Sequence, residues 1–362
     1  MKQWKGLATA GATRRRCEAL LPAGSWSQQG PWSVSQLGWG TLPGELKNIV
    51  DSKIESALPR VLAGGLNVLD TSPAYRCRRS QAAVGAALGR ELARGALARE
   101  EIVVATHAGW IHAPRLEDDP AAVLRDEVLP ATGLAAAEFA GGVWSLHPAW
   151  LAHQLDQAAD LAGLAAFDLL WLDAPETGLQ AWPRDRWRGH LLEAFRACEA
   201  WVAEGRLGGY GLCSLQGFQL DGQGRPRLDL PELWQLARQA ADGEPALRAL
   251  MLPYSLAALD LLNFEVEGRP LTAWAREHGL WLQTILPLGQ GQLAQGLPAF
   301  LRQAMPGLSA AQCALQVARS TEGVGTVVTG MKSREHIAEN LALLAHPALN
   351  QGDWARLFDS GS

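Results

Sequence analysis

Residues 65–75 read Gly65-Leu-Asn-Val-Leu-Asp70-Thr-Ser-Pro-Ala-Tyr75, and Ser80 and Val84-Gly85 follow shortly after. The apolar run that ends at Asp70 predicts a strand buried on both faces, as in a parallel sheet covered by helices. Taken alone, Asp70-Thr71 is typical of a turn that caps the next helix. The complete string is more specific, because it places a carboxylate at a strand end and a tyrosine in the following loop.

Short apolar runs alternate with longer helical patterns about eight times along the chain. The predicted strands are Val34–Gly40, Leu66–Asp70, Ile102–Thr106, Phe167–Asp173, Gly208–Cys213, Leu250–Tyr254, Leu280–Ile285 and Gly325–Gly330. The predicted helices are Ile49–Leu62, Gln81–Ala93, Leu151–Leu161, Leu191–Glu204, Pro231–Ala241, Leu271–His278, Ser309–Ser320 and Ser333–Leu344. Eight such pairs favour an α/β fold with a single closed (β/α)8 TIM barrel. An open doubly wound sheet is the alternative, but no Gly-x-Gly-x-x-Gly follows the first strand.

We predict one domain, with an N-terminal extension over residues 1–30, the barrel over residues 31–346 and a C-terminal tail over residues 347–362. The longest irregular connection runs from Ala108 to Pro148, after the third strand. Connections of this length are usually lids or disordered insertions. Because it leaves the end of a barrel strand, we expect it to lie over the carboxyl-terminal mouth, where barrel sites are built.

The composition indicates a globular protein with a sizeable core, since 48% of the 362 residues are hydrophobic and 19% are charged. No apolar run approaches the ~18 residues of a membrane span, so we expect no membrane partner. The net charge of -5 gives no electrostatic reason to expect nucleic acid as a partner.

Five scattered cysteines without a Cys-x-x-Cys pair predict reduced thiols and a cytoplasmic protein. The N-terminus carries Lys2, Lys5 and Arg14-Arg15-Arg16 and no acid before Glu18. We interpret it as a frayed basic tail, with a short organelle-targeting segment as the alternative.

The Gly65–Tyr75 string resembles the second strand–helix unit of the aldo-keto reductases, and further motifs of that family follow in order as far as Leu344. The resemblance implies a catalytic Asp and Tyr at Asp70 and Tyr75. It also implies a Lys and a His at two later strand ends, where this chain has His107 and Asp173 instead.

These substitutions change the charge of the predicted site. A tyrosine that protonates an alkoxide needs a neighbouring positive charge, because its pKa is ordinarily near ~10. A protonated His107 beside Asp70 could partly replace the family's Lys, but we expect it to be neutral much of the time at pH 7. Asp173 accepts hydrogen bonds and donates only when protonated. The resulting negative pocket is expected to raise the pKa of Tyr75 and to oppose a developing alkoxide.

The last predicted strand and helix resemble the family's NADP(H)-binding segment. The resemblance implies cofactor contacts at Gly330, Lys332, Ser333, Arg334, Glu339 and Asn340, and a loop over the pyrophosphate at Pro287, Leu288, Gly289 and Gly291. A helix N-terminus attracts anions, although a plain N-cap with solvated charges is the alternative for Lys332–Arg334.

The positions that would hold the nicotinamide depart from the family. They are Cys213 and Ser214 in place of Ser-Asn, Met251 in place of Gln and Ile285 in place of the stacking Tyr. These side chains bond a carboxamide more weakly or not at all. The adenosine-phosphate end is therefore better preserved than the reactive end.

Three functions remain open. The first is NADPH-dependent reduction of an aldehyde or ketone, by a monomer or weak homo-oligomer that acts on a small carbonyl substrate. The second is an inactive barrel that binds NADP(H) as a sensor or scaffold. The third is a hydrolase or lyase that uses Asp70 and Asp173 as paired carboxylates. We predict no metal site, because His147 and His153 lack an acidic or Cys partner at ligand spacing.

Overall fold

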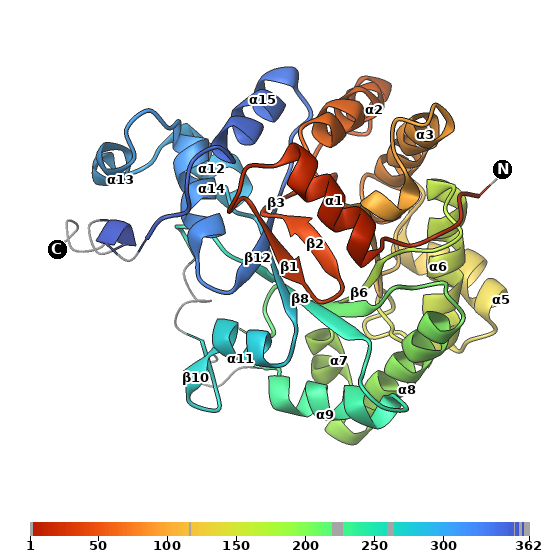
Figure 1. Cartoon of the computed structure of the whole chain (residues 1–362). Helices are drawn as coiled ribbons and strands as arrows, with labels where there is room; N and C mark the ends of the chain where they lie inside the picture. Colours follow the sequence, from red (N-terminus) through yellow and green to blue (C-terminus); the bar gives the residue numbers. More distant parts are fainter. Residues whose placement is uncertain are drawn as a thin grey trace.

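In the computed structural model, eight parallel strands close into a barrel surrounded by helices (Figure 1). The structure describes residues 3–115, 117–218, 227–258, 264–350, 352–354 and 357. The barrel strands, in their order around the barrel, are β3 (Leu37–Gly40), β4 (Val68–Asp70), β5 (Val103–Ala108), β6 (Leu169–Asp173), β7 (Tyr210–Cys213), β8 (Leu247–Pro253), β11 (Trp281–Ile285) and β12 (Val324–Thr329). The predicted (β/α)8 barrel is confirmed.

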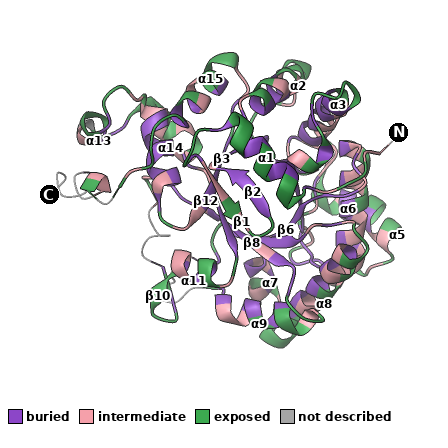
Figure 2. Cartoon of the chain, in the orientation of Figure 1, coloured by how far each residue is buried: buried purple, intermediate pink, exposed green. Residues whose placement is uncertain are grey.

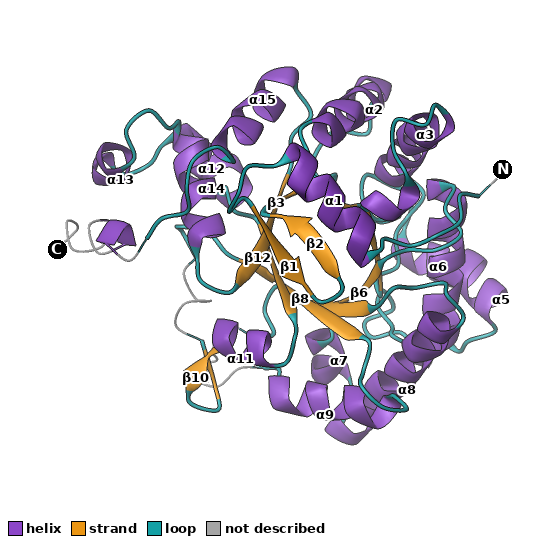
Figure 3. Ribbon diagram, viewed as in Figure 1, coloured by secondary structure: helices purple, strands orange, loops and turns teal. Residues whose placement is uncertain are grey.

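The helices form a ring outside the strands (Figure 3). Those that follow barrel strands are α2 (Asn48–Ala63), α3 (Arg79–Ala93), α6 (Pro148–Ala162), α8 (Arg184–Ala203), α9 (Leu230–Ala240), α11 (Leu271–Glu277), α14 (Ala310–Ser320) and α15 (Arg334–Leu343). Their inner faces and the strands are buried, whereas their outer faces are exposed (Figure 2). Inside the barrel, Trp171, Met251 and Trp281 belong to one buried cluster, so the interior is a packed core.

The predicted first strand, Val34–Gly40, is wrong in one respect: it is two strands of different sheets. Residues Trp26–Gln29 (β1) and Trp32–Ser35 (β2) form an antiparallel hairpin, and the barrel begins only at Leu37. The chain turns at Gln36, whose N–H donates to Ser25 O at 2.9 Å. Trp32 of the hairpin packs edge-on against Trp281 of the barrel core, which explains why its residues are as apolar as a barrel strand.

The interpretation of the N-terminus as a frayed tail is also wrong. Ala10–Leu20 form a helix, α1, which Thr9 caps by accepting a hydrogen bond from the Ala12 N–H. Arg16 is buried, donates to the carbonyl of Leu62 and lies 3.6 Å from Glu101. Arg16 therefore anchors α1 across the hairpin end of the barrel, whereas Arg14 and Arg15 are exposed (Figure 1).

The long connection after β5 is folded over its described residues, which exclude position 116. It contains α4 (Pro120–Val123), a π-helical turn (Leu124–Val128), α5 (Leu129–Thr132) and a short 3-10 turn (Ala136–Glu138). They surround a small apolar core of their own. The indole N–H of Trp144 donates to the backbone oxygen of Asp173 at 2.7 Å, so the connection lies against the carboxyl end of β6, at the mouth of the barrel.

All five cysteines are free. Among the described residues, no helix has the length and apolarity that crossing a bilayer requires. Part of the predicted tail, residues 351, 355–356 and 358–362, lies outside the described residues.

Candidate functional site

Four neighbouring barrel strands end in polar or sulfur-containing side chains. Asp70 is the last residue of β4, His107 is the penultimate residue of β5, and Asp173 and Cys213 end β6 and β7. Because the carboxyl ends of parallel strands meet at one edge, these side chains converge at the mouth of the barrel. The structure therefore brings together Asp70, His107 and Asp173, three of the four residues predicted as catalytic, and the fourth, Tyr75, lies in the loop after β4.

The hydroxyl of Tyr75 faces this group. It donates to Oδ2 of Asp70 at 3.0 Å and lies 3.1 Å from Nε2 of His107. Three successive left-handed residues, Arg76, Cys77 and Arg78, then turn the chain into α3. Burial raises the pKa of Tyr75 well above its ordinary value, and the charges of Asp70 and Asp173 raise it further. The tyrosine is thus a protonated donor that requires help to release its proton.

His107 lies between two carboxylates. Its Nε2 is 2.8 Å from Oδ1 of Asp70, and its Nδ1 is 2.7 Å from Oδ1 of Asp173. Burial alone would lower the pKa of His107, but the charges of Asp173 and Asp70, and its hydrogen bonds to both, outweigh burial and raise that pKa well above the ordinary value. The expectation of a mostly neutral His107 is therefore wrong, because it considered Asp70 as the only partner.

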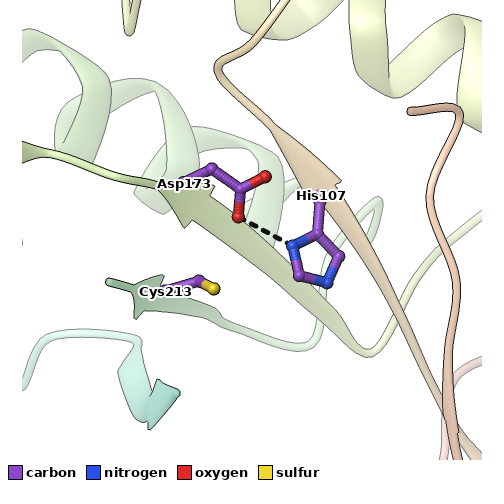
Figure 4. A group of neighbouring side chains, drawn as sticks. All are labelled: His107, Asp173 and Cys213. Atoms are coloured by element: carbon purple, nitrogen blue, oxygen red, sulfur yellow. Dashed lines mark hydrogen bonds and ion pairs between the residues drawn. The ribbon is translucent and has the colours of Figure 1, made fainter. Parts of the chain in front are cut away.

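Cys213 is the fourth member of the group and the one whose neighbours the sequence did not reveal. Figure 4 shows its sulfur beside His107 and Asp173, and the three potential ligand atoms all lie within 4.8 Å of one another. Burial, and then the charge of Asp173, raises the pKa of the thiol to about 12. The sequence predicts no metal site because these residues are far apart in the chain, whereas the barrel places them together.

A cavity of about 640 Å³ opens beside Asp70 and Tyr75. Its lining residues are Gly40, Leu42, Pro43, Asp70, Tyr75, Ile285, Leu286, Pro287, Leu288, Gln290, Gly291, Val328, Thr329 and Gly330. Of the residues predicted to bind a cofactor, Pro287, Leu288, Gly291 and Gly330 lie in this lining. The loop that follows β11 reaches its shape through left-handed backbone at Gly289 and Gly291, with φ of 53° and 95°.

The predicted phosphate-binding residues lie at the start of α15 and do not line the cavity. Ser333 caps the helix by accepting a hydrogen bond from the His336 N–H, as the N-cap alternative predicts. Lys332 donates to the carbonyl of Pro43, which does line the cavity. Arg334 is exposed.

The two predicted adenine contacts have partners within the protein. Glu339 accepts a hydrogen bond from the Ser309 hydroxyl, and the buried Asn340 amide lies 3.7 Å from the sulfur of Met331. An adenine would have to share or displace these partners.

Of the predicted nicotinamide positions, Ile285 lines the cavity, whereas Ser214 and Met251 have other surroundings. Ser214 donates to Oε1 of Glu176 at 2.9 Å, and Met251 is buried inside the barrel. Glu176, a carboxylate only 4% exposed, was missed by the sequence analysis, although it follows the end of β6 by three residues. Gln283 was missed too: it is 1% exposed, and its amide has no hydrogen-bond partner among the described residues.

A model of the Aldo/keto reductase family matches residues 36–296 of the chain. The chain belongs to this family. A search of curated proteins found no match.

Solved aldo-keto reductases share the fold at low identity. The holo form of an aldo-keto reductase from Bacillus halodurans is 19% identical, with a TM-score of 0.64 over 92% of this chain and 95% of that one. An aldo/keto reductase from Klebsiella pneumoniae in complex with NADP and acetate is 20% identical, with a TM-score of 0.63 over 93% and 95%. A glycerol dehydrogenase from Gluconobacter oxydans is 15% identical, with a TM-score of 0.65 over 93% and 95%.

Within this aldo-keto reductase, the mouth carries an imidazolium and two carboxylates around one tyrosine. The imidazolium offers the positive charge that a tyrosine needs to give up a proton, but the second carboxylate leaves the group with a net negative charge. The arrangement can donate a proton from Tyr75, and it can also bind a cation.

Proposed function

We propose that this protein reduces an aldehyde or ketone with NADPH, using Tyr75 as the proton donor. One observation carries the proposal: the Tyr75 hydroxyl lies 3.1 Å from Nε2 of His107, at the edge of the cavity that the β11 loop and the end of β12 line. A carbonyl bound there would lie beside the hydroxyl. The family membership and the NADP bound to the Klebsiella pneumoniae relative support the cofactor class.

Support for a bound dinucleotide comes from the cavity lining and from Lys332, which bonds Pro43 of that lining. The lining is mostly apolar, as ligand cavities are, and Gly291 and Gly330 let a ligand approach the backbone closely. Lys332 and Arg334 at the start of α15 would meet a phosphate. When bound, NADPH supplies a hydride.

The residues of this chain would then handle the proton. Tyr75 donates its hydroxyl proton to the carbonyl oxygen, and the imidazolium of His107 stabilises the phenolate and returns a proton from Nε2. Asp70 keeps the ring of His107 in place through its 2.8 Å contact. The negative charge of Asp173 opposes phenolate formation, so we expect slow turnover.

The second function, an NADP(H)-binding sensor or scaffold, gains support from the reactive end. Ser214 is engaged with Glu176, Met251 is buried, and Ile285 offers no ring for stacking. The third function, a paired-carboxylate hydrolase, is less favoured, because Asp70 and Asp173 both bond the same imidazole.

A titration and an assay separate these functions. NADPH is added to the pure protein while the fluorescence of its 15 tryptophans is followed, and an aromatic aldehyde is then supplied. We expect Tyr75→Phe to lower turnover by about 10²–10⁴-fold and to leave NADPH binding unchanged. Binding without turnover would favour the sensor, and no binding would reject both and favour the hydrolase.

We also propose that the enzyme works in the cytoplasm with reduced thiols, on a small carbonyl substrate, as a monomer or weak homo-oligomer. The five free cysteines, four of them buried, support the reducing compartment.

A further inference from the structure

We propose that His107, Asp173 and Cys213 form a zinc site at the mouth of the barrel, with Nδ1, a carboxylate oxygen and Sγ as ligands. The three side chains come from adjacent strands, and Asp173 and Cys213 are register partners across β6 and β7. Their potential ligand atoms all lie within 4.8 Å of one another (Figure 4). No other such group of three or more occurs among the described residues.

The chemistry of the three donors selects the metal. An imidazole, a carboxylate and a thiolate together suit a borderline-soft ion, and Zn²⁺ accepts all three at tetrahedral geometry. Calcium and magnesium prefer oxygen ligands alone. Cys213 is only 8% exposed, so its thiolate would have little contact with water, and a metal is the partner that would make it stable there.

The surroundings of His107 match those of a metal-bound histidine. Such a histidine usually donates its second ring N–H to a carboxylate, which fixes the tautomer and turns the other nitrogen toward the metal. Here Nε2 lies 2.8 Å from Oδ1 of Asp70, which leaves Nδ1 on the side of Asp173 and Cys213. Trp144 holds the backbone oxygen of Asp173 at 2.7 Å and fixes the end of β6.

The imidazole and the carboxylate need to separate only slightly to admit the ion. Nδ1 of His107 and Oδ1 of Asp173 are 2.7 Å apart, whereas two ligands of a tetrahedral zinc, at bond lengths of ~2.0–2.1 Å, are roughly 3.3 Å apart. The side chain of Asp173 is 19% exposed, against 4% for His107, so the carboxylate is the ligand with room to shift. Zinc would displace one proton from Nδ1 and one from the thiol, which leaves the net charge of the site unchanged.

Three protein ligands leave a fourth position open, as in catalytic zinc sites. Water or a carbonyl oxygen could take that position. In a reductase, the bound ion would also polarise the carbonyl of the substrate. This second role rests on the proposed function, whereas the binding of the metal does not.

Cobalt is the probe, because Co²⁺ reports its ligands by absorption. Metal-free protein is titrated with CoCl₂ and then with ZnCl₂. We expect one Co²⁺ per chain, a near-ultraviolet thiolate-to-cobalt band, visible bands of a four-coordinate ion, and loss of all of them when zinc is added.

Cys213→Ser is expected to lose the near-ultraviolet band, and Asp173→Asn and His107→Gln are each expected to weaken Co²⁺ binding more than tenfold. Asp70→Asn is expected to weaken it by about 10–100-fold. Cys77→Ser, at a cysteine outside the group, is the matched control and keeps the band.

The outcomes separate this proposal from the proposed function. Absence of the near-ultraviolet band in the wild-type protein, or its survival in a folded Cys213→Ser variant, overturns the zinc site. Far-ultraviolet circular dichroism and a thermal melt establish that each variant is folded. Stoichiometric zinc binding without NADPH-dependent turnover would support the zinc site and contradict the proposed reductase function. Turnover in protein that binds no zinc would support the reductase function and contradict the zinc site.

Discussion

Nδ1 of His107 lies 2.7 Å from Oδ1 of Asp173, so two residues 66 positions apart form one ion pair at the mouth of the barrel. The Lys and His that the resemblance implies at these two positions would not attract each other in this way. The pair decides the electrostatics of the site, because it gives His107 a second carboxylate and brings a second negative charge near Tyr75.

Replacing Asp173 by Asn is expected to lower the pKa of Tyr75 from its raised value. The charge of Asp173 is one of the causes of that rise, after burial and the charge of Asp70. Spectrophotometric titration of metal-free protein measures the phenolate, and subtraction of the same curve for Tyr75→Phe isolates this tyrosine from the two others. An unchanged Tyr75 curve in the variant would show that Asp173 does not act on the hydroxyl.

Combining His107→Lys with Asp173→His is expected to raise the reductase rate at least about tenfold. The change replaces a net negative charge by the family's balanced one, which favours a developing alkoxide. Steady-state rates with an aromatic aldehyde and saturating NADPH provide the measurement. If the folded double variant binds NADPH and gains nothing, the substituted contacts at Cys213, Met251 and Ile285 limit the rate instead.

Two glycines of α3 are expected to respond in opposite ways to alanine. A Cβ at Gly85 would lie 2.6 Å from the backbone oxygen of Leu161 and 2.7 Å from the Cα of Ala162, so the helices would have to separate. We expect Gly85→Ala to lower the free energy of unfolding by about 1–3 kcal/mol. Gly89→Ala, whose nearest neighbour is the Trp4 indole at 3.6 Å, should raise it by about 0.5–1 kcal/mol. Urea denaturation of both variants provides the comparison, and equal effects would refute the close packing of α3 on α6.

His112 is expected to make the protein less stable in mild acid. Burial lowers its pKa from 6.5 to about 4, and the neutral ring bonds Oε1 of Gln157 at 2.5 Å. Below pH 6.5 His112 therefore binds a proton in the unfolded chain, whereas in the folded protein it binds one only near pH 4. The neutral His112 therefore contributes fully to stability above pH 6.5, and this contribution is lost as the pH falls toward 4. At pH 5 the free energy of unfolding is expected to be lower by about 2 kcal/mol.

Denaturation with urea at pH 7 and pH 5 tests this expectation. His112→Gln should lose less stability between the two values than the wild type does, whereas a variant of the exposed His336 should behave as the wild type. An equal loss in His112→Gln and the wild type would assign the acid sensitivity to other groups.

Most of the barrel could be predicted because its strands are short apolar runs between amphipathic helices. The prediction failed at Val34–Gly40, where the hairpin and the first barrel strand are equally apolar, and local pattern does not say which sheet a run joins. It also failed at Ala10–Leu20, because a basic segment resembles a solvated tail until a buried partner such as Leu62 O is known.

The sequence by itself determined the eightfold strand–helix pattern and the Asp70–Tyr75 spacing, and its resemblance to the family led us to expect that His107 and Asp173 replace two family residues. These are properties of local order along the chain. Only the tertiary structure decided that His107 bonds two carboxylates and that Cys213 lies beside them. Closing the barrel sets the ends of β4 to β7 side by side, and their charges then act on one another through a buried medium in which pairing outweighs the cost of burial.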